Sequence, residues 1–455
     1  MSRVLSSKQS MKSREIHFEK GPIVGALLSY TAPILLSQLL QQVYNITDCV
    51  IVGRFCGSYG LAAAGLGGLI LSVLINFFIG FSTGAGILVS QQFGAYRYEK
   101  LRKTISTIVH LGMLLGLLLT GAGLVSSRLL LRMISCPEDM FSVSNTYLMI
   151  CFLGLLPQLV YNIGNAILEA LGDTKSPLHY LFFSCLINLG LDALFVIGFD
   201  FGLAGAAAAT VIAQWILFFM MMGRLYMLDP AYAYRMNSEM LSLKELGEMI
   251  ALSLPSGMQA VFMSISSLVL QVTINSFGAA AVAGMTVYAK LEGFLYYPAF
   301  SYGIALTGFV GQNYGARCMD RVKQSVRVSL GVCTAIILPL SLFLVAISHH
   351  ALGIFTTDAD VIYNGCQAIL YNFPFYFLYM INQIYLGSLK GLGKTTYPMI
   401  CTMVCYCFFR VFWCWLWIPH FHSMIVVYTS YDASWIVMIL MLIPYFRKTL
   451  KEKSA

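Results

Sequence analysis

Long apolar runs, separated by short polar stretches, dominate this chain of 455 residues. Only 11% of the residues are charged and 58% are hydrophobic, whereas a soluble domain usually carries about 25% charged residues. So few charges cannot cover the water-exposed surface of a soluble protein of this length. Because a bilayer core requires about 20 apolar residues per helix, the runs predict an all-α polytopic membrane protein.

Twelve of these runs are long enough to span a bilayer. They lie at residues 22–54, 59–90, 104–126, 141–168, 176–199, 202–227, 246–277, 280–312, 324–347, 361–388, 397–419 and 424–446. The longest internal polar stretch separates the first six runs from the last six. We therefore expect a cytoplasmic N-terminal tail (1–20), an N-lobe (21–227), a cytoplasmic linker (228–245), a C-lobe (246–447) and a cytoplasmic C-terminal tail (448–455).

The distribution of basic residues predicts the orientation of the chain. With the N-terminus in the cytoplasm, 23 of the 28 Lys and Arg residues fall in cytoplasmic segments. Arg54, Arg128 and Arg132 fall in outer segments, and Lys290 and Arg410 lie inside spans. Cytoplasmic loops of membrane proteins are enriched in basic residues, so this bias predicts an even number of spans and two cytoplasmic termini. It also explains the net charge of +8 without a nucleic-acid partner.

An internal repeat relates the two halves of the chain. SQQFGA at 90–95 resembles GQNYGA at 311–316, and LGDTKSP at 171–177 resembles LGKTTYP at 392–398, each with a shift of 221 residues. Because each half holds six predicted spans, the halves share one orientation and should form a parallel repeat with a pseudo-two-fold axis along the membrane normal. Transporters with internal repeats bind substrate at the repeat interface and rock one repeat against the other.

Two acidic residues lie at similar depth inside predicted spans of the first half. A charged group in the hydrocarbon costs at least about 2.5–3.5 kcal/mol. The presence of Asp48 and Asp192 inside spans therefore indicates that they have a function or a structural partner. Gln41, Asn188 and Thr210 are expected in the same layer. Two carboxylates repel each other at low dielectric, so such a pair can take up a proton near neutral pH or bind Na⁺. We predict a cation-coupling site at these five residues, with a structural hydrogen-bond network as the alternative.

The second half offers further candidates for contacts with a substrate or a cavity. These are Glu292, Arg410, Tyr376 and Asn372. An ion pair between Glu292 and Arg410 would explain both charges, and a substrate contact of Glu292 is the alternative. No phosphate loop, nucleophile elbow or zincin motif is present. We therefore expect no enzyme activity, no cofactor beyond the coupling ion, and no metal beyond Na⁺ at Asp48 and Asp192.

Several motifs together resemble the MATE (multidrug and toxic compound extrusion) family of bacterial type, over about residues 20–447. The motifs are the proline of span 1 followed by Asn45-x-x-Asp48, the SQQFGA and GQNYGA turns, EALGDTKSP (169–177), NLGLD (188–192), GLAGAAAATVIAQ (202–214) and GLGKTTYP (391–398). The resemblance implies two six-helix lobes around a central cavity. It further implies antiport of H⁺ or Na⁺ against small amphipathic or cationic organic compounds such as drugs and toxins.

The resemblance also assigns residues. Family members with a cation site in the N-lobe build it at positions that match Gln41, Asp48, Asn188, Asp192 and Thr210. Other members carry acids in spans 7 and 10, where this chain has none. We expect a monomer in the bacterial inner (plasma) membrane, with organic substrates and membrane lipids as its partners. A lipid-linked oligosaccharide flippase of the related superfamily is the alternative, although it commonly has several basic residues in its cavity. An intramembrane enzyme or receptor is a third hypothesis, which no catalytic cluster supports.

Overall fold

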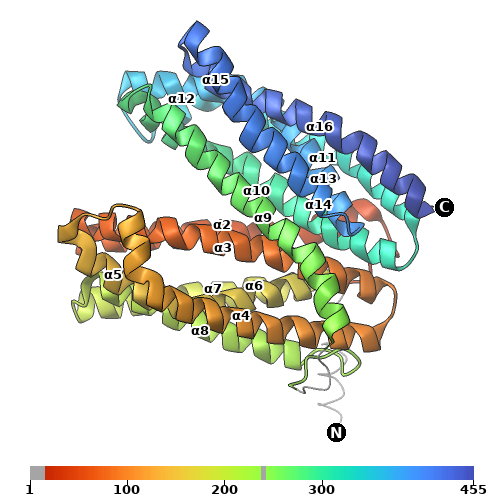
Figure 1. Ribbon diagram of the computed structural model, residues 1–455. Coiled ribbons are helices and arrows are strands. Elements are labelled where there is room, and N and C mark those ends of the chain that lie inside the picture. Colours follow the sequence, from red (N-terminus) through yellow and green to blue (C-terminus); the bar gives the residue numbers. More distant parts are fainter. Residues whose placement is uncertain (1–15, 237–241, 455) are drawn as a thin grey trace. The chain divides into compact units, whose positions relative to one another are not determined.

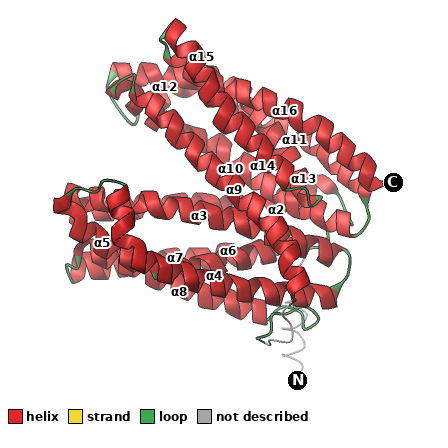
Figure 2. Cartoon of the chain, viewed as in Figure 1, coloured by secondary structure: helices red, strands yellow, loops and turns green. Residues whose placement is uncertain are grey.

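The computed structural model describes residues 16–236 and 242–454, and every regular element within these ranges is a helix (Figure 2). Residues 1–15 of the expected N-terminal tail, 237–241 of the expected linker and 455 of the expected C-terminal tail lie outside the described residues. The expectation of an all-α chain is confirmed for the part that the structure describes.

The helices of the first half lie over the predicted apolar runs, but the run at 141–168 is divided between two helices, and the helix over 104–126 is longer than its run at both ends (Figure 1). They are α2 (Ile23–Phe55), α3 (Gly57–Gly94), α4 (Tyr98–Met133), α5 (Glu138–Phe152), α6 (Leu155–Ala170), α7 (Lys175–Asp192), the π-helical segment η1 (Ala193–Gly198) and α8 (Gly202–Tyr226).

The helices of the second half repeat this order. They are α9 (Leu243–Asn275), α10 (Ala279–Gly315), α11 (Met319–Gly353), α12 (Ala359–Asn372), the 3₁₀ turn η3 (Phe373–Phe375), α13 (Tyr376–Gly391), α14 (Thr396–Thr402), the π-helical segment η4 (Met403–Phe409), α15 (Arg410–Phe421) and α16 (Met424–Ser454).

The described helices include nine that are long and apolar enough to cross a membrane, or ten if α5 and α6 form one span with a bend of 42°. Twelve spans were predicted. The two predicted runs outside this set, 280–312 and 361–388, correspond to a helix with charged residues and to a helix pair with a break. α10 carries Lys290 and Glu292 in its 37 residues, and α12 and α13 are short helices of 14 and 16 residues separated by η3. The chain is thus an all-helical, multi-pass membrane protein.

The internal repeat extends to the irregularities of the helices. α6 begins at Leu155 and α13 begins at Tyr376, which is a shift of 221 residues, and each follows a break in its helical segment. In the first half, α6 packs against α3, α4 and α8, and in the second half α13 packs against α10, α11 and α16. The duplicated sequence therefore places an equivalent helix at the centre of each half.

The described residues divide into two compact units, one made of 16–17, 32–236 and 242–257 and the other of 18–31 and 258–454. These limits differ from the predicted lobes in two segments. The start of α2 packs with the second unit, where the backbone N–H of Phe18 donates to Gln312 Oε1 at 3.1 Å. The first part of α9 packs with the first unit, where Thr104 Oγ1 donates to Glu245 Oε2 at 3.0 Å.

The LGDTKSP motif of the first repeat has a structural role at the start of α7. Asp173 is 1% exposed and its Oδ2 lies 2.7 Å from Nη2 of Arg224, at the end of α8. The same carboxylate accepts hydrogen bonds from the backbone N–H of Ser176 at 3.0 Å and from its hydroxyl at 2.7 Å. The motif therefore ties the beginning of one helix to the end of the next. The second repeat has Lys394 at the equivalent position and cannot form this contact.

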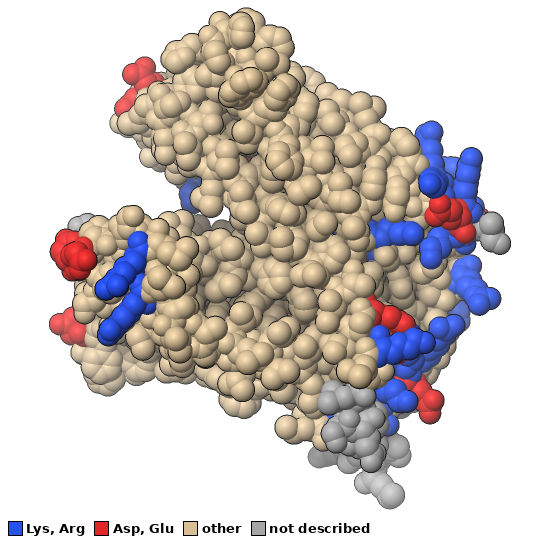
Figure 3. Space-filling model, viewed as in Figure 1, with Lys and Arg blue, Asp and Glu red and all other residues tan. Residues whose placement is uncertain are grey.

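Charged side chains are unevenly distributed over the visible surface. On the face drawn in Figure 3, most Lys and Arg side chains gather toward one end of the helices, and a broad surface with few charges covers their middle. An uncharged band of this kind is what helices require to contact the hydrocarbon of a bilayer.

Candidate functional site

The two acidic residues predicted to couple cations both lie in the first unit, Asp48 on α2 and Asp192 at the last position of α7. Asp192 is 1% exposed, and the two carboxyls are near enough to interact electrostatically. The Oδ1 atom of each is buried and has no hydrogen-bond partner within the described residues. Since buried polar atoms in native proteins are nearly always paired, these two oxygens are open positions for a proton or a bound cation.

Neutral polar groups from two helices surround the Asp192 carboxyl. With its amide nitrogen turned toward Asp192, Asn188 donates to Asp192 Oδ2 at 2.9 Å, and its oxygen accepts from the backbone N–H of Thr210 at 3.2 Å. Asn188 and Asp192 are four residues apart, so they lie on one face of α7. The π-helical segment η1 starts directly after Asp192, and such segments often occur at functional sites because they interrupt regular α-helical pairing.

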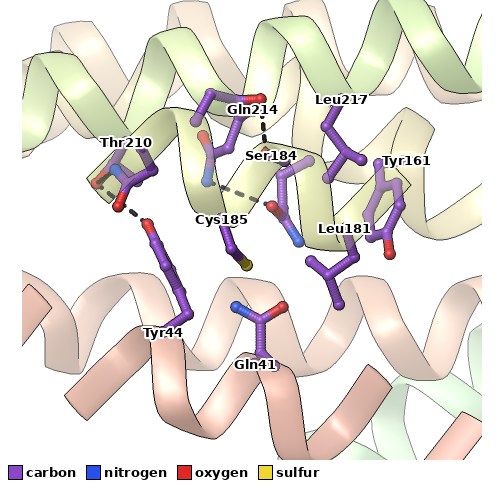
Figure 4. Close-up of a pocket in the computed structure, with 12 residues that line it drawn as sticks. Gln41, Tyr44, Tyr161, Leu181, Ser184, Cys185, Thr210, Gln214 and Leu217 are labelled. Atoms are coloured by element: carbon purple, nitrogen blue, oxygen red, sulfur yellow. Dashed lines mark hydrogen bonds between the residues drawn. The ribbon is translucent and has the colours of Figure 1, made fainter. Parts of the chain in front are cut away.

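A third helix joins this arrangement through a tyrosine. The Tyr44 hydroxyl of α2 donates to Thr210 Oγ1 of α8 at 3.3 Å (Figure 4). Gln41 and Tyr44 line a pocket on the α2 side, and Asn188 and Thr210 line it from α7 and α8. Helices far apart in sequence thus place polar side chains around one space inside the first unit.

The five predicted residues do not all have the same role. Asn188, Asp192 and Thr210 form one hydrogen-bonded chain, and Gln41 faces the pocket. Asp48 interacts with Asp192 through its charge, with one carboxylate oxygen left open. The cation-coupling role of these five residues stays a prediction, and the direct contacts between them depend on how α2, α7 and α8 pack.

Of the twelve residues that line the pocket, only Gln41, Asn188 and Thr210 were predicted from the sequence, and three of the polar residues that were missed are Tyr44, Gln158 and Gln214. Tyr44 lies three residues after Gln41 and four before Asp48, so helical spacing alone would have placed it on the same face. Gln158 and Gln214 also line the pocket, where Gln214 Nε2 donates to Gln158 Oε1 at 3.3 Å. They are neutral, so no embedded charge drew attention to them.

The candidates of the second half form a different cluster. The Tyr376 hydroxyl donates to Glu292 Oε1 at 3.2 Å. The Arg410 guanidinium lies over the rings of Tyr406 and Tyr431, 4.4 Å from each centroid, and its Nε donates to Ser434 Oγ at 2.9 Å.

The expected ion pair between Glu292 and Arg410 is not formed. No salt bridge within 4.0 Å joins these two side chains, both of which the structure describes. The reason is that the Glu292 carboxyl and the Arg410 guanidinium each contact another side chain. Two aromatic faces attract the guanidinium through cation–π interactions, and Tyr376 supplies a hydrogen bond to Glu292. Asn372, the last candidate, is fully buried, and both polar atoms of its amide lack a partner within the described residues.

Fold and site together define a multi-pass helical membrane protein with membrane-embedded carboxyls that are only partly hydrogen-bonded. The family model described as MatE matches the chain twice, over residues 33–194 and 255–416. These matches cover more than half of the chain, which therefore belongs to the MatE family and is a MATE family transporter rather than an enzyme. The second match begins 222 residues after the first, from 33 to 255, which confirms the internal repeat.

Curated relatives agree with this assignment. The chain is 27% identical over 438 residues to the "Probable multidrug resistance protein YoeA" of Bacillus subtilis, with 93% of each chain covered. It is 24% identical over 394 residues to the "Multidrug export protein MepA" of Staphylococcus aureus strain MSSA476, with 84% of this chain and 85% of the relative covered.

Solved structures share the fold. One described as the "Outward-facing conformation of a multidrug resistance MATE family transporter of the MOP superfamily" superposes with a TM-score of 0.89 at 19% identity, covering 97% of this chain and 99% of the other. Another, described as MATE "in the bent conformation", has a TM-score of 0.88 at 20% identity and covers 96% of this chain and 98% of that one.

Proposed function

We propose that this protein is a secondary active antiporter that exports small amphipathic or cationic organic compounds in exchange for H⁺ or Na⁺. The observation that carries the proposal is the pair of carboxyls of Asp48, which is half-buried, and Asp192, which is buried; each has one buried oxygen without a hydrogen-bond partner among the described residues. A purely structural network would leave neither oxygen unpaired. The names of the curated relatives, which refer to multidrug resistance and multidrug export, support the substrate class.

We further propose that the chain has twelve spans in two six-helix lobes, which a parallel pseudo-two-fold repeat relates. The protein would lie in the bacterial plasma membrane, with both termini on the cytoplasmic side. α10 has 37 residues and at a rise of 1.5 Å per residue reaches about 55 Å, which exceeds the roughly 30 Å of a bilayer core. The broken segment α12–η3–α13 matches α5–α6 of the other repeat. The charge bias of the loops supports the orientation.

Coupling follows from the electrostatics of the carboxyl pair. Two carboxylates in a low-dielectric layer repel each other, and a proton or Na⁺ between them relieves the repulsion. Occupation changes the net charge that α2 and α7 carry, so it favours one packing of these helices over another. The rocking of the lobes around a central cavity would then exchange the cation for an organic compound.

The decisive experiment is transport into vesicles that contain only this protein. A fluorescent organic cation should accumulate when a proton gradient, or separately a Na⁺ gradient, is imposed. The gradient that drives accumulation identifies the coupling ion. If neither gradient drives it while the protein is folded and correctly inserted, the antiport proposal fails.

A lipid-linked oligosaccharide flippase is less well supported. Such a protein would be expected to present basic side chains to its anionic substrate. Arg410 is only 9% exposed and is held between two tyrosines. Transport of a lipid-linked sugar, with no response of an organic cation to either gradient, would favour the flippase.

A further inference from the structure

A second cluster of charged residues lies in the second unit, apart from the carboxyl pair of the first. It contains Glu292 on α10, Arg410 at the start of α15 and Asp432 on α16. With the repeat shift of 221, the equivalent positions in the first half are Leu71, Leu189 and Val211. The cluster is therefore no copy of the carboxyl pair, and the duplication of the fold does not explain it.

The contacts of α10 place its polar face against α12 and α13. A Cβ on Gly284 would lie 3.0 Å from the backbone nitrogen of Gly365 on α12. Two turns later Glu292 accepts the hydrogen bond of Tyr376 on α13. Tyr288 lies between these two contacts, and its ring centroid is 5.6 Å from that of Phe373, which follows Asn372. The helix spacing therefore puts Asn372 at the level of Tyr288, one turn from the Glu292–Tyr376 contact.

The contacts of α16 place Asp432 at the same level. One turn before it, the Tyr428 hydroxyl donates to the backbone carbonyl of Asn364 on α12. Almost one turn after it, the Trp435 ring lies 5.3 Å from the Tyr376 ring on α13. Asp432 thus lies on the face of α16 that covers the junction of α12 and α13, next to Tyr431, whose ring holds Arg410.

Unpaired polar atoms converge at this level. Asn372 is fully buried, and neither its Oδ1 nor its Nδ2 has a partner in the part of the chain that the structure describes. Asp432 Oδ1 is likewise buried without a partner among the described residues. Buried groups that can donate and accept yet stay unpaired indicate a missing occupant. A carboxylic acid proton on Asp432 can supply a donor to such a neighbouring acceptor.

The charges of the cluster do not cancel. The cluster contains two carboxyl groups and one guanidinium, so it carries one surplus negative charge when all three groups are ionised. The other ionisable groups around it are tyrosines and cysteines, whose pKa values are ordinarily about 10 and about 8.5. They are Tyr288, Tyr296, Tyr297, Tyr376, Tyr379, Tyr406, Tyr431, Cys405, Cys407 and Cys414. Lys290 is exposed, and residues 258–275 of α9 and 328–348 of α11 contain no charged side chain. Nothing nearby in this unit compensates the surplus charge.

We propose that the Glu292–Arg410–Asp432 cluster holds one exchangeable proton on one of its two carboxyls, which compensates the surplus negative charge. The single positive charge of Arg410 balances the other carboxylate without a salt bridge to it, and Asn372 and Tyr288 lie at the level of Asp432. The proton is bound within the second unit without any contribution from Asp48 or Asp192. Binding of this proton goes beyond the antiport function, because the cluster would hold it whether or not the protein transports an organic compound.

Infrared spectroscopy tests this proposal, because a protonated carboxyl has a C=O band that a carboxylate lacks. The measurement uses purified full-length protein of an Asp48→Asn/Asp192→Asn double variant, so that the first unit's pair does not contribute. Near neutral pH the C=O band should lose the intensity of one protonated carboxyl on adding either Asp432→Asn or Glu292→Gln, since the charge of the remaining acid is then balanced by Arg410. Adding Arg410→Gln should instead raise the band by the intensity of one carboxyl.

Two comparisons make the result specific. Asp360→Asn removes an exposed carboxyl from the first turn of α12 and should leave the band unchanged. The spectra are taken in choline and in Na⁺ at one pH. Loss of the band in Na⁺ would assign the surplus charge to a bound Na⁺ and overturn the proton assignment.

A band unaffected by both Asp432→Asn and Glu292→Gln would also overturn the proposal. The two substitutions preserve side-chain shape and act on different helices, so misfolding of one leaves the other as a test. Failure of the antiport proposal would show in the vesicle assay of the wild-type protein and would not alter these spectra.

Discussion

Asn188 donates a hydrogen bond to Asp192 Oδ2 at 2.9 Å from one turn away on α7, while the other oxygen of Asp192 stays open. The amide therefore orients the carboxyl without satisfying it. A carboxyl that is held in place but left with a free position is prepared for a small occupant. This contact explains why α7 carries both residues on one face.

Replacement of Asp48 by Asn should abolish coupled transport and leave expression intact. The substitution removes one of the two charges that a cation would neutralise. Loss of even 1.4 kcal/mol of cation binding reduces the affinity about tenfold, so gradient-driven accumulation of an organic cation should fall at least that far. Glu138→Gln, at an exposed position of α5, is the matched control and should transport at the wild-type rate. Wild-type rates in Asp48→Asn would place the coupling site elsewhere.

Tyr44→Phe should weaken cation binding without abolishing transport. It deletes a single neutral hydrogen bond to Thr210, which is worth about 1 kcal/mol. The concentration of cation that gives half-maximal transport should rise several-fold while the maximal rate changes little. Thr210→Val removes the acceptor of the same bond. The double variant should need no higher cation concentration for half-maximal transport than the single variant that needs the higher one. Additive losses would show that the bond does not couple the two residues.

Arg224→Gln should destabilise the protein strongly. The Asp173–Arg224 pair is almost fully buried, and removal of one partner from a buried pair costs about 3–5 kcal/mol because the other charge is left uncompensated. Thermal unfolding of the purified protein measures the loss. The Asp173→Asn/Arg224→Gln double variant should recover part of the stability. Lys323→Gln, which breaks the exposed Asp320–Lys323 pair, is the control, and an equal loss there would contradict the role of burial.

Gly84→Ala should destabilise the contact of α3 with the first part of α9. A Cβ at Gly84 would lie 2.3 Å from Cα of Ser253, so the helix backbones would have to separate. Overpacking of this kind costs about 1–3 kcal/mol, again measured by thermal unfolding. Gly68 lies on the same helix with nothing within 4 Å of its Cβ position, so Gly68→Ala should be neutral or slightly stabilising. Equal effects of the two substitutions would argue against the close approach.

Much of the fold could be predicted because the membrane constrains it. Every lipid-exposed backbone group must be paired within its own segment, so long apolar runs become helices, and α2, α4 and α11 lie over their predicted runs. The break between α12 and α13 was not predicted, although Pro374 marks it. A proline can kink a membrane helix, or neighbouring helices can pair the backbone groups that it leaves free. The sequence of one segment does not show which helices are its neighbours.

The candidate site could likewise be predicted only in part. Depth and helical spacing were sufficient to group Asp48, Asp192 and Asn188, because a residue's position on its own helix follows from its number. Spacing could not identify Gln158 and Gln214, since they lie on α6 and α8 and meet only when these helices pack.

By itself the sequence determined that this protein is a helical membrane protein built from two repeats, and that its few embedded charges must be functional or paired. The tertiary structure decided which partner each charge takes. Arg410 lies between Tyr406 and Tyr431 instead of on Glu292, and one oxygen each of Asp48 and Asp192 stays open. The physical reason is that hydrophobicity and periodicity set the face of each helix, whereas partners depend on the rotation and depth at which helices pack.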